Sequence, residues 1–168
     1  TGVCFTRNPK TGEKTFFGEW LPNAQGEDVV AGTHTPLPLN SHSTEDADAN
    51  TLEKALPEVY KHLVELQSQL EQHYKDMQDI EFTIEQGKLY LLQTRTGKRS
   101  PSASIQIAVD LVHEGLISKE SALKKVDARS LELILRPIID PNAPKTIVAK
   151  GLDSSPGAAF GRVAFTSE

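Results

Sequence analysis

Hydrophobic and polar residues alternate most clearly in residues 79–99, DIEFTIEQGKLYLLQTRTGKR. In the first part, Ile80, Phe82 and Ile84 alternate with polar side chains, and this period of two predicts a β-strand with one face toward a core. A second run rich in Leu and Tyr, residues 89–95, follows a short polar stretch that contains a glycine. The segment therefore predicts a β-hairpin.

The length of the hairpin loop decides which side chains share a face of the sheet. A two-residue loop would place Phe82 on the same face as Gln93, whereas a three-residue loop separates the apolar set from the polar set. We therefore predict a three-residue loop in which Gly87 takes the left-handed conformation. The apolar face would then hold Ile80, Phe82, Ile84, Tyr90 and Leu92. The opposite face would hold Asp79, Glu81, Gln93 and Arg95.

This polar face would carry two carboxylates, one amide and one guanidinium on adjacent strands. Carboxylate and amide oxygens suit Mg²⁺, and the rigid fork of an arginine suits phosphate. The set therefore fits a metal–polyphosphate such as ATP. The alternative is a solvated sheet face with one Glu–Arg ion pair, because surface charges usually need no function. The pattern alone leaves both interpretations open.

The chain before the hairpin predicts two short strands, a loop and one long helix. The strands fall at residues 3–6 and 15–20, on either side of a turn. Residues 34–50 are polar and contain prolines, which predicts an exposed, mobile loop. Apolar residues recur at steps of three and four over residues 56–77, which predicts a helix packed across the sheet. Its apolar stripe comprises Val59, Leu63, Leu66, Leu70, Tyr74 and Met77.

Three further helices are predicted after the hairpin. Ser100 is the expected N-cap of the first helix and Pro101 its first residue, and Gly115 would end it. Ser118 and Asp127 are the expected caps of two shorter helices. A proline-rich linker and short strand-like runs separated by Gly and Pro follow them.

Composition narrows the class of protein. With 168 residues, 38% of them hydrophobic and 24% charged, the chain is typical of a globular domain with or without an appendage. The net charge of −5 without a basic block does not suggest a nucleic-acid surface. The single cysteine, Cys4, excludes an internal disulfide framework and a cysteine-based zinc site, and it favours a reducing compartment.

The hydropathy of the chain and its two ends give further information on the kind of protein. No apolar run is long enough to span a membrane. The chain opens in an apolar strand without Met or a signal-peptide pattern, and it stops just after another strand. We therefore expect a piece of a larger protein.

Residues 79–99 resemble the closing hairpin of the ATP-grasp nucleotide domain in the pyruvate, phosphate dikinase family. The strings GVCFTRNP-x-TGEK, NAQGEDVVAG, VDLVHEGLISKESAL and LRPIIDP resemble the same family. Phosphoenolpyruvate synthases have a similar strand but usually end in QARPE, so the ending QTR-x-GKR favours the dikinases. A fragment of a synthase, which uses water in place of phosphate, stays the alternative enzyme.

The resemblance implies an α+β fold in three parts. Residues 1–99 would be the C-terminal subdomain of an ATP-grasp domain, an antiparallel sheet with packed helices. Residues 100–145 would be a helical connector and Pro-rich linker, and residues 146–168 the first strands of a swivelling phosphohistidine domain. The phosphorylated His of the family lies in a GG-x-T-S-H-A string that this chain lacks.

The resemblance also implies roles for single residues. Glu81 and Gln93 would bind Mg²⁺, and Arg95 would contact the ATP phosphates as the catalytic residue. Asp79 would be an accessory acidic position in the same site. Glu27, in the string QGE, would also lie at the nucleotide site; apart from the resemblance it is an ordinary loop carboxylate.

The activity that the resemblance implies is that of a phosphotransferase. The family interconverts ATP, phosphate and pyruvate with AMP, pyrophosphate and phosphoenolpyruvate through a phosphohistidine, as a homodimer with Mg²⁺. This chain would supply metal ligands and a phosphate clamp and would be inactive alone, because the His and the pyruvate site are missing. The family occurs in the cytoplasm, in plastids and in glycosomes. A non-catalytic scaffold and hinge module is the alternative from another class.

Overall fold

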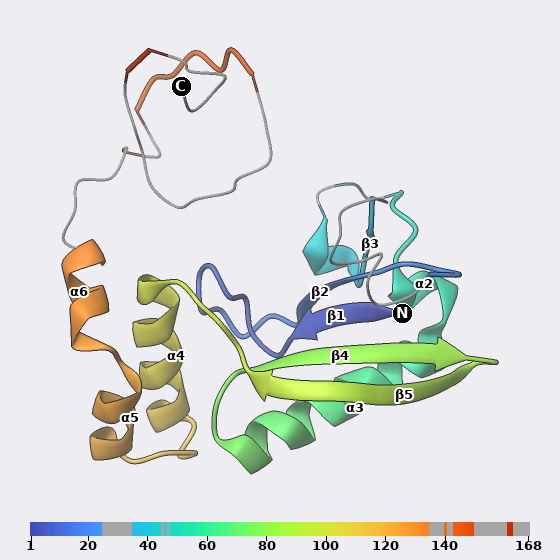
Figure 1. The fold of residues 1–168 in the computed structure, drawn as a ribbon, viewed down its shortest axis with the longest axis horizontal. Coiled ribbons are helices and arrows are strands. Elements are labelled where there is room, and N and C mark those ends of the chain that lie inside the picture. Colours follow the sequence, from blue (N-terminus) through green and yellow to red (C-terminus); the bar gives the residue numbers. More distant parts are fainter. Residues whose placement is uncertain are drawn as a thin grey trace, which may run out of the picture.

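The computed structural model combines one antiparallel sheet with helices (Figure 1). It describes residues 1–24, 35–44, 46, 48–134, 140, 143–149, 161 and 162. The strands are β1 (Gly2–Phe5), β2 (Phe17–Trp20), β3 (Leu37–Pro38), β4 (Gln78–Glu85) and β5 (Lys88–Thr96). Their order in the sheet is β3-β2-β1-β4-β5, and each neighbouring pair is antiparallel. The predicted antiparallel sheet with packed helices is therefore confirmed.

The helices form two groups. The described helices are η1 (Ser41–Ser43), α2 (Leu52–Ala55), α3 (Pro57–Tyr74), α4 (Pro101–His113), α5 (Lys119–Lys125) and α6 (Ala128–Ile134). Helix α3 runs along one face of β4 and β5, whereas α4, α5 and α6 gather beside one end of these strands (Figure 1). The hairpin thus has a helix behind it and a helical group at the end where β5 leads into α4.

The long helix is shorter than the sequence predicts. It ends at Tyr74 because Lys75 takes the left-handed conformation, with a φ of 52°, and thereby stops the helical hydrogen bonding. Val59 and Leu63 face the core as expected, but the side chain of Tyr74 is exposed. Met77 is buried, yet it lies after the helix and belongs to a different cluster. The prediction for the last turn was therefore wrong.

Two hydrophobic clusters hold the fold. The larger joins strands β1, β2 and β4 to the helices behind them, and its buried members are Cys4, Trp20, Leu39, Leu52, Leu63, Ile80 and Phe82. The smaller packs α4 against the residues just before β4, and its buried members are Met77, Ala103, Ile107 and Leu111. The second cluster fixes the helical group to the base of the hairpin.

The caps of the helical group are those that the sequence predicts. The hydroxyl of Ser100 accepts a hydrogen bond from the backbone N–H of Ala103 at 3.1 Å, at the start of α4. The hydroxyl of Ser118 accepts one from the N–H of Ser121 at 3.2 Å, at the start of α5. Gly115 follows α4 with a φ of 72°, a conformation that favours glycine.

The predicted loop over residues 34–50 contains the short elements β3 and η1 and two buried residues. Leu39 and Asn40 are buried beside the edge strand β3. The amide of Asn40 donates hydrogen bonds to the carbonyl of Phe16 at 2.8 Å and to the hydroxyl of Tyr60 at 3.0 Å. The prediction of an exposed loop was therefore wrong at these residues. Composition alone does not show that the amide of Asn40 is buried and hydrogen-bonded to groups of the core.

Candidate functional site

The β4–β5 hairpin closes with a two-residue loop. Glu85 pairs with Lys88, so Gln86 and Gly87 form the turn and the predicted three-residue loop is wrong. Both turn residues have positive φ, 50° and 76°. Positive φ at both positions is typical of a type I′ turn, whose twist matches the strands that it joins.

A β-bulge at Leu92 restores the pairing that the loop length would have disturbed. Glu81 pairs with Gln93, whereas the next residue of β4, Phe82, pairs with Leu91, which leaves Leu92 as the extra residue. Asp79 pairs with Arg95 in the same register as Glu81 with Gln93. The four polar residues therefore share one face of the hairpin, as their alternation predicts, with Phe82 on the other.

The bulge changes the apolar face beyond it. Tyr90 pairs with Thr83, so it lies on the same face as Glu81 rather than with Phe82. Tyr90 and Leu92 are both exposed, and Leu89 packs against the larger core cluster in their place. The predicted core positions of Tyr90 and Leu92 were therefore wrong, because the residues before and after the bulge have opposite parity.

Arg95 holds the two carboxylates of the polar face together. Its Nε donates a hydrogen bond to Oδ2 of Asp79 at 2.8 Å, and its Nη2 lies 3.7 Å from Oε1 of Glu81. The side chain of Asp79 is 10% exposed, whereas that of Arg95 is 57% exposed. The hydrogen bond that Arg95 donates to Asp79 raises the pKa of the guanidinium above its ordinary value, so the group stays positively charged. A fixed, permanently charged fork thus faces solvent beside two acids.

The residues present fit a divalent cation. Directly opposed residues of an antiparallel pair have Cβ atoms about 5 Å apart, so the oxygens of Glu81 and Gln93 can reach one ion. Mg²⁺ is commonly bound by one or two protein oxygens, while substrate phosphates and water complete its octahedron. In the described part of the chain no group of three or more His, Cys, Asp or Glu side chains forms a complete protein site. The face therefore suits an ion that arrives with its own phosphate ligands.

The remaining predicted residue, Glu27, lies outside the described residues. The structure therefore brings together Asp79, Glu81, Gln93 and Arg95. Glu27 stays a prediction from the resemblance.

A second charged cluster, which we call the Arg7 cluster, joins β1 to α3 and α4. Arg7 is fully buried and donates hydrogen bonds to Glu71 at 2.7 to 3.1 Å and to Glu114 at 2.8 to 2.9 Å. Among the described residues its Nη1 has no hydrogen-bond partner, and it lies 3.8 Å from Oδ2 of Asp110. Lys14 donates a hydrogen bond to Glu114 at 2.8 Å. One guanidinium thus faces carboxylates from two helices.

The Arg7 cluster joins residues that lie far apart in the sequence, and it lowers the pKa of one carboxyl group. The partners of Arg7, Glu71 and Glu114, lie 64 and 107 residues away along the chain. Burial favours the neutral acid at Glu114, yet the hydrogen bonds from Lys14 and Arg7 outweigh it and lower the pKa of Glu114. No local pattern in the sequence marks such a long-range partner.

A third charged group ties the helical group to the hairpin. Asp76 is buried just before β4 and accepts hydrogen bonds from Arg99 at 2.7 Å and from Lys125 at 2.9 Å. Burial acts to raise the pKa of Asp76, but these two cations outweigh it and lower the pKa. Lys125 ends α5, so this carboxylate fixes α5 relative to the start of β4.

The polar face lies within the part of the chain that a protein-family comparison matches. Residues 38–115 match the family model described as "Pyruvate phosphate dikinase, AMP/ATP-binding domain". The match thus includes the whole β4–β5 hairpin and α4. These residues therefore belong to the class of AMP/ATP-binding domains.

Curated relatives extend the match to the rest of the chain. The chain is 52% identical over its whole length to pyruvate, phosphate dikinase of Rhizobium meliloti and 51% identical to that of Clostridium symbiosum. It is 52% identical to the chloroplastic pyruvate, phosphate dikinase of Flaveria trinervia. The chain belongs to the pyruvate, phosphate dikinase family, and it spans 17% to 19% of the length of these relatives. In the described residues no helix is long and apolar enough to cross a membrane.

Proposed function

We propose that this chain supplies part of the ATP site of a pyruvate, phosphate dikinase. The observation that carries the proposal is the pairing of Glu81 with Gln93 and of Asp79 with Arg95 on one face, inside the stretch matched by the AMP/ATP-binding model. A scaffold or hinge module has no need for a positioned guanidinium beside two acids. A nucleotide site has a use for both.

Each residue of the face has a separate task in this proposal. Glu81 and Gln93 hold Mg²⁺, which when bound neutralises charge on the phosphates. Arg95 binds a phosphate oxygen through the guanidinium nitrogens that Asp79 leaves available. Asp79 orients Arg95 and thereby reduces the side-chain conformational entropy that Arg95 would lose on binding phosphate. Glu27 is the further residue of the nucleotide site that the family resemblance implies.

Catalysis by this face rests on position and charge. Phosphoryl transfer needs the reacting groups aligned and the developing negative charge stabilised, and little covalent work by the protein. The acceptor is a histidine of the swivelling domain, which begins at residues 146–168 after the connector over residues 100–145. In the intact homodimer the phosphoryl group then reaches pyruvate. The relative from Flaveria trinervia is described as chloroplastic, which fits a location in an organelle.

The requirement for phosphate tests the proposed reaction in the intact protein. We expect ATP and pyruvate to give phosphoenolpyruvate, AMP and pyrophosphate only when inorganic phosphate is present. Phosphorus NMR of the products measures this directly. A phosphoenolpyruvate synthase would instead form AMP and phosphate without added phosphate. That result would overturn the assignment to a dikinase reaction while leaving an ATP site in place.

The 168-residue chain alone should bind Mg·ATP weakly. The ATP-grasp fold holds its nucleotide between two lobes, and this chain spans under one fifth of its relatives. Calorimetric titration should therefore give a Kd above about 10 μM, which corresponds to roughly −7 kcal/mol. The Arg95→Ala chain serves as the baseline for non-specific binding. A Kd clearly below that limit, lost in the variant, would show that the chain holds a complete site.

A further inference from the structure

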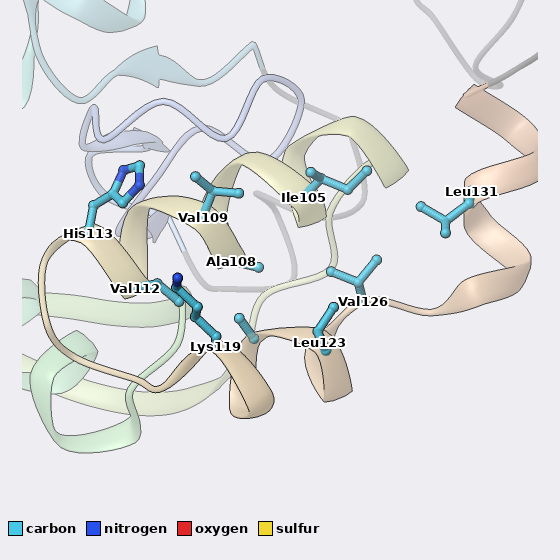
Figure 2. A pocket seen from close by; sticks show the side chains of 10 residues that line it. Ile105, Ala108, Val109, Val112, His113, Lys119, Leu123, Val126 and Leu131 are labelled. Carbon is cyan, nitrogen blue, oxygen red and sulfur yellow. The ribbon is translucent and has the colours of Figure 1, made fainter.

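Helices α4, α5 and α6 enclose an apolar groove with a volume of about 530 Å³. Figure 2 shows Val109 on α4, Leu123 on α5 and Leu131 on α6 among the side chains that line the groove. All three side chains are exposed, and that of Leu123 is 78% exposed. Aliphatic side chains that converge from three helices and stay in contact with water are typical of an interaction site.

The charges of the groove have one sign. The only ionisable residues that line it are His113 and Lys119, and no carboxylate of the described chain lines it. The rest of the lining is aliphatic. An occupant with apolar side chains and an adjacent acidic residue would complement this surface.

The size of the groove argues against two other kinds of occupant. A stable interface with a second protein copy buries about 1,600 Å² in total, which is more than a groove of this size offers. A small-molecule site normally adds several convergent polar groups that fix the orientation of its ligand. A segment of the same polypeptide can bind with a smaller buried area and fewer polar contacts, because its effective concentration near the groove is high.

The position of the groove points to the same conclusion. Helix α4 lies inside the stretch that matches the AMP/ATP-binding model, which ends at Gly115, whereas α5 and α6 follow that stretch. The groove is therefore built across the end of the nucleotide-binding part. About four fifths of the relatives' length lies outside the region that this chain matches.

We propose that the α4–α6 groove docks an apolar segment with an acidic flank from the remainder of the dikinase polypeptide. The inference rests on the proposed function, because it requires this chain to be part of such an enzyme. The helices that form the groove are connected to the β4–β5 hairpin by contacts already described. Helix α5 carries Lys125, which pairs with Asp76 before β4, and α4 leads into Glu114 of the Arg7 cluster.

A photo-crosslinking experiment on the full-length protein tests the docking. The photoreactive residue benzoylphenylalanine replaces Leu123, and the matched control carries it at Ser121, an exposed residue of α5 that does not line the groove. Irradiation should give a crosslink within one polypeptide, from position 123 to a peptide outside residues 1–168 that contains apolar and acidic residues. The control should not form this crosslink.

Charge variants test the acidic flank. In the protein with the crosslinker at position 123, Lys119→Glu should reduce the yield roughly five-fold, the factor expected for the loss of one exposed ion pair. Lys119→Arg should preserve the yield. Equal yields from both variants would contradict an acidic occupant.

Three crosslinking results would overturn the docking itself. They are a product with the mass of two chains, a crosslink that stays inside residues 1–168, and the absence of any crosslink. The proposed function is tested separately, by the formation of phosphoenolpyruvate. A protein that forms the expected crosslink without making phosphoenolpyruvate would contradict the proposed function, whereas one that makes phosphoenolpyruvate without the crosslink would contradict the docking alone.

Discussion

Replacing Arg95 with alanine is expected to slow the formation of phosphoenzyme from ATP by roughly 10² to 10³-fold in the intact protein, the usual effect of losing one preorganised charge-stabilising donor. Arg95 is held by Asp79 at 2.8 Å while its side chain stays 57% exposed, so it is fixed in place and free to meet a phosphate. Rapid-quench measurement of the ATP half-reaction gives the rate. The rate for Arg95→Lys should fall between those of the unmodified protein and Arg95→Ala, because lysine keeps the charge and lacks the guanidinium fork.

The other half-reaction is the control for this prediction. Exchange of the phosphoryl group between the enzyme histidine and phosphoenolpyruvate should be unchanged in Arg95→Ala. Lys88→Ala, at the exposed turn end of the same hairpin, should leave both half-reactions unchanged. Equal loss in the two half-reactions of Arg95→Ala would indicate a folding defect and contradict a specific role at ATP.

Replacing Arg7 with alanine is expected to destabilise the chain by about 3–5 kcal/mol, because the change leaves buried carboxylates without their cation. Glu71 dominates this effect, since its side chain is 6% exposed, whereas Glu114 and Asp110 are partly solvated. The midpoint of thermal unfolding should fall by roughly 10 °C. Circular dichroism on the 168-residue chain measures the change.

The neighbouring lysine provides the matched control for Arg7. Lys14→Ala removes the exposed partner of Glu114 and should cost less than about 1 kcal/mol. A loss of under 1 kcal/mol for Arg7→Ala would show that the buried cluster is not a main support of the fold. That outcome would leave the apolar contacts of the smaller hydrophobic cluster as the main support of α4.

The hairpin shows how far alternation predicts a structure. The alternation of Ile80 and Phe82 with polar residues was sufficient to predict that Glu81 and Gln93 share a face. It could not predict the loop, because an odd loop and an even loop with one bulge give the same parity near the open end. The two solutions differ only for residues between the turn and the bulge. For this reason the prediction failed at Tyr90.

The sequence predicts local interactions, such as helix caps, better than contacts between distant residues. Ser100 and Ser118 cap their helices as predicted, because capping depends on residues three positions away. The partners of Arg7 lie far along the chain, and only the completed packing of β1, α3 and α4 brings them together. The sequence could therefore predict the longer elements and the polar face, but not the short elements β3 and α2 or the buried charges that join distant elements.

The binding of metal by Glu81 and Gln93 is tested most directly by diffraction from crystals of the intact protein with Mn²⁺ and a non-hydrolysable ATP analogue. Mn²⁺ replaces Mg²⁺ at oxygen sites and gives an anomalous signal. We expect an anomalous peak about 2.1 Å from an oxygen of Glu81 and from the amide oxygen of Gln93, with Arg95 on a phosphate of the analogue. A metal peak coordinated by other residues, with Glu81 and Gln93 left in solvent, would contradict it.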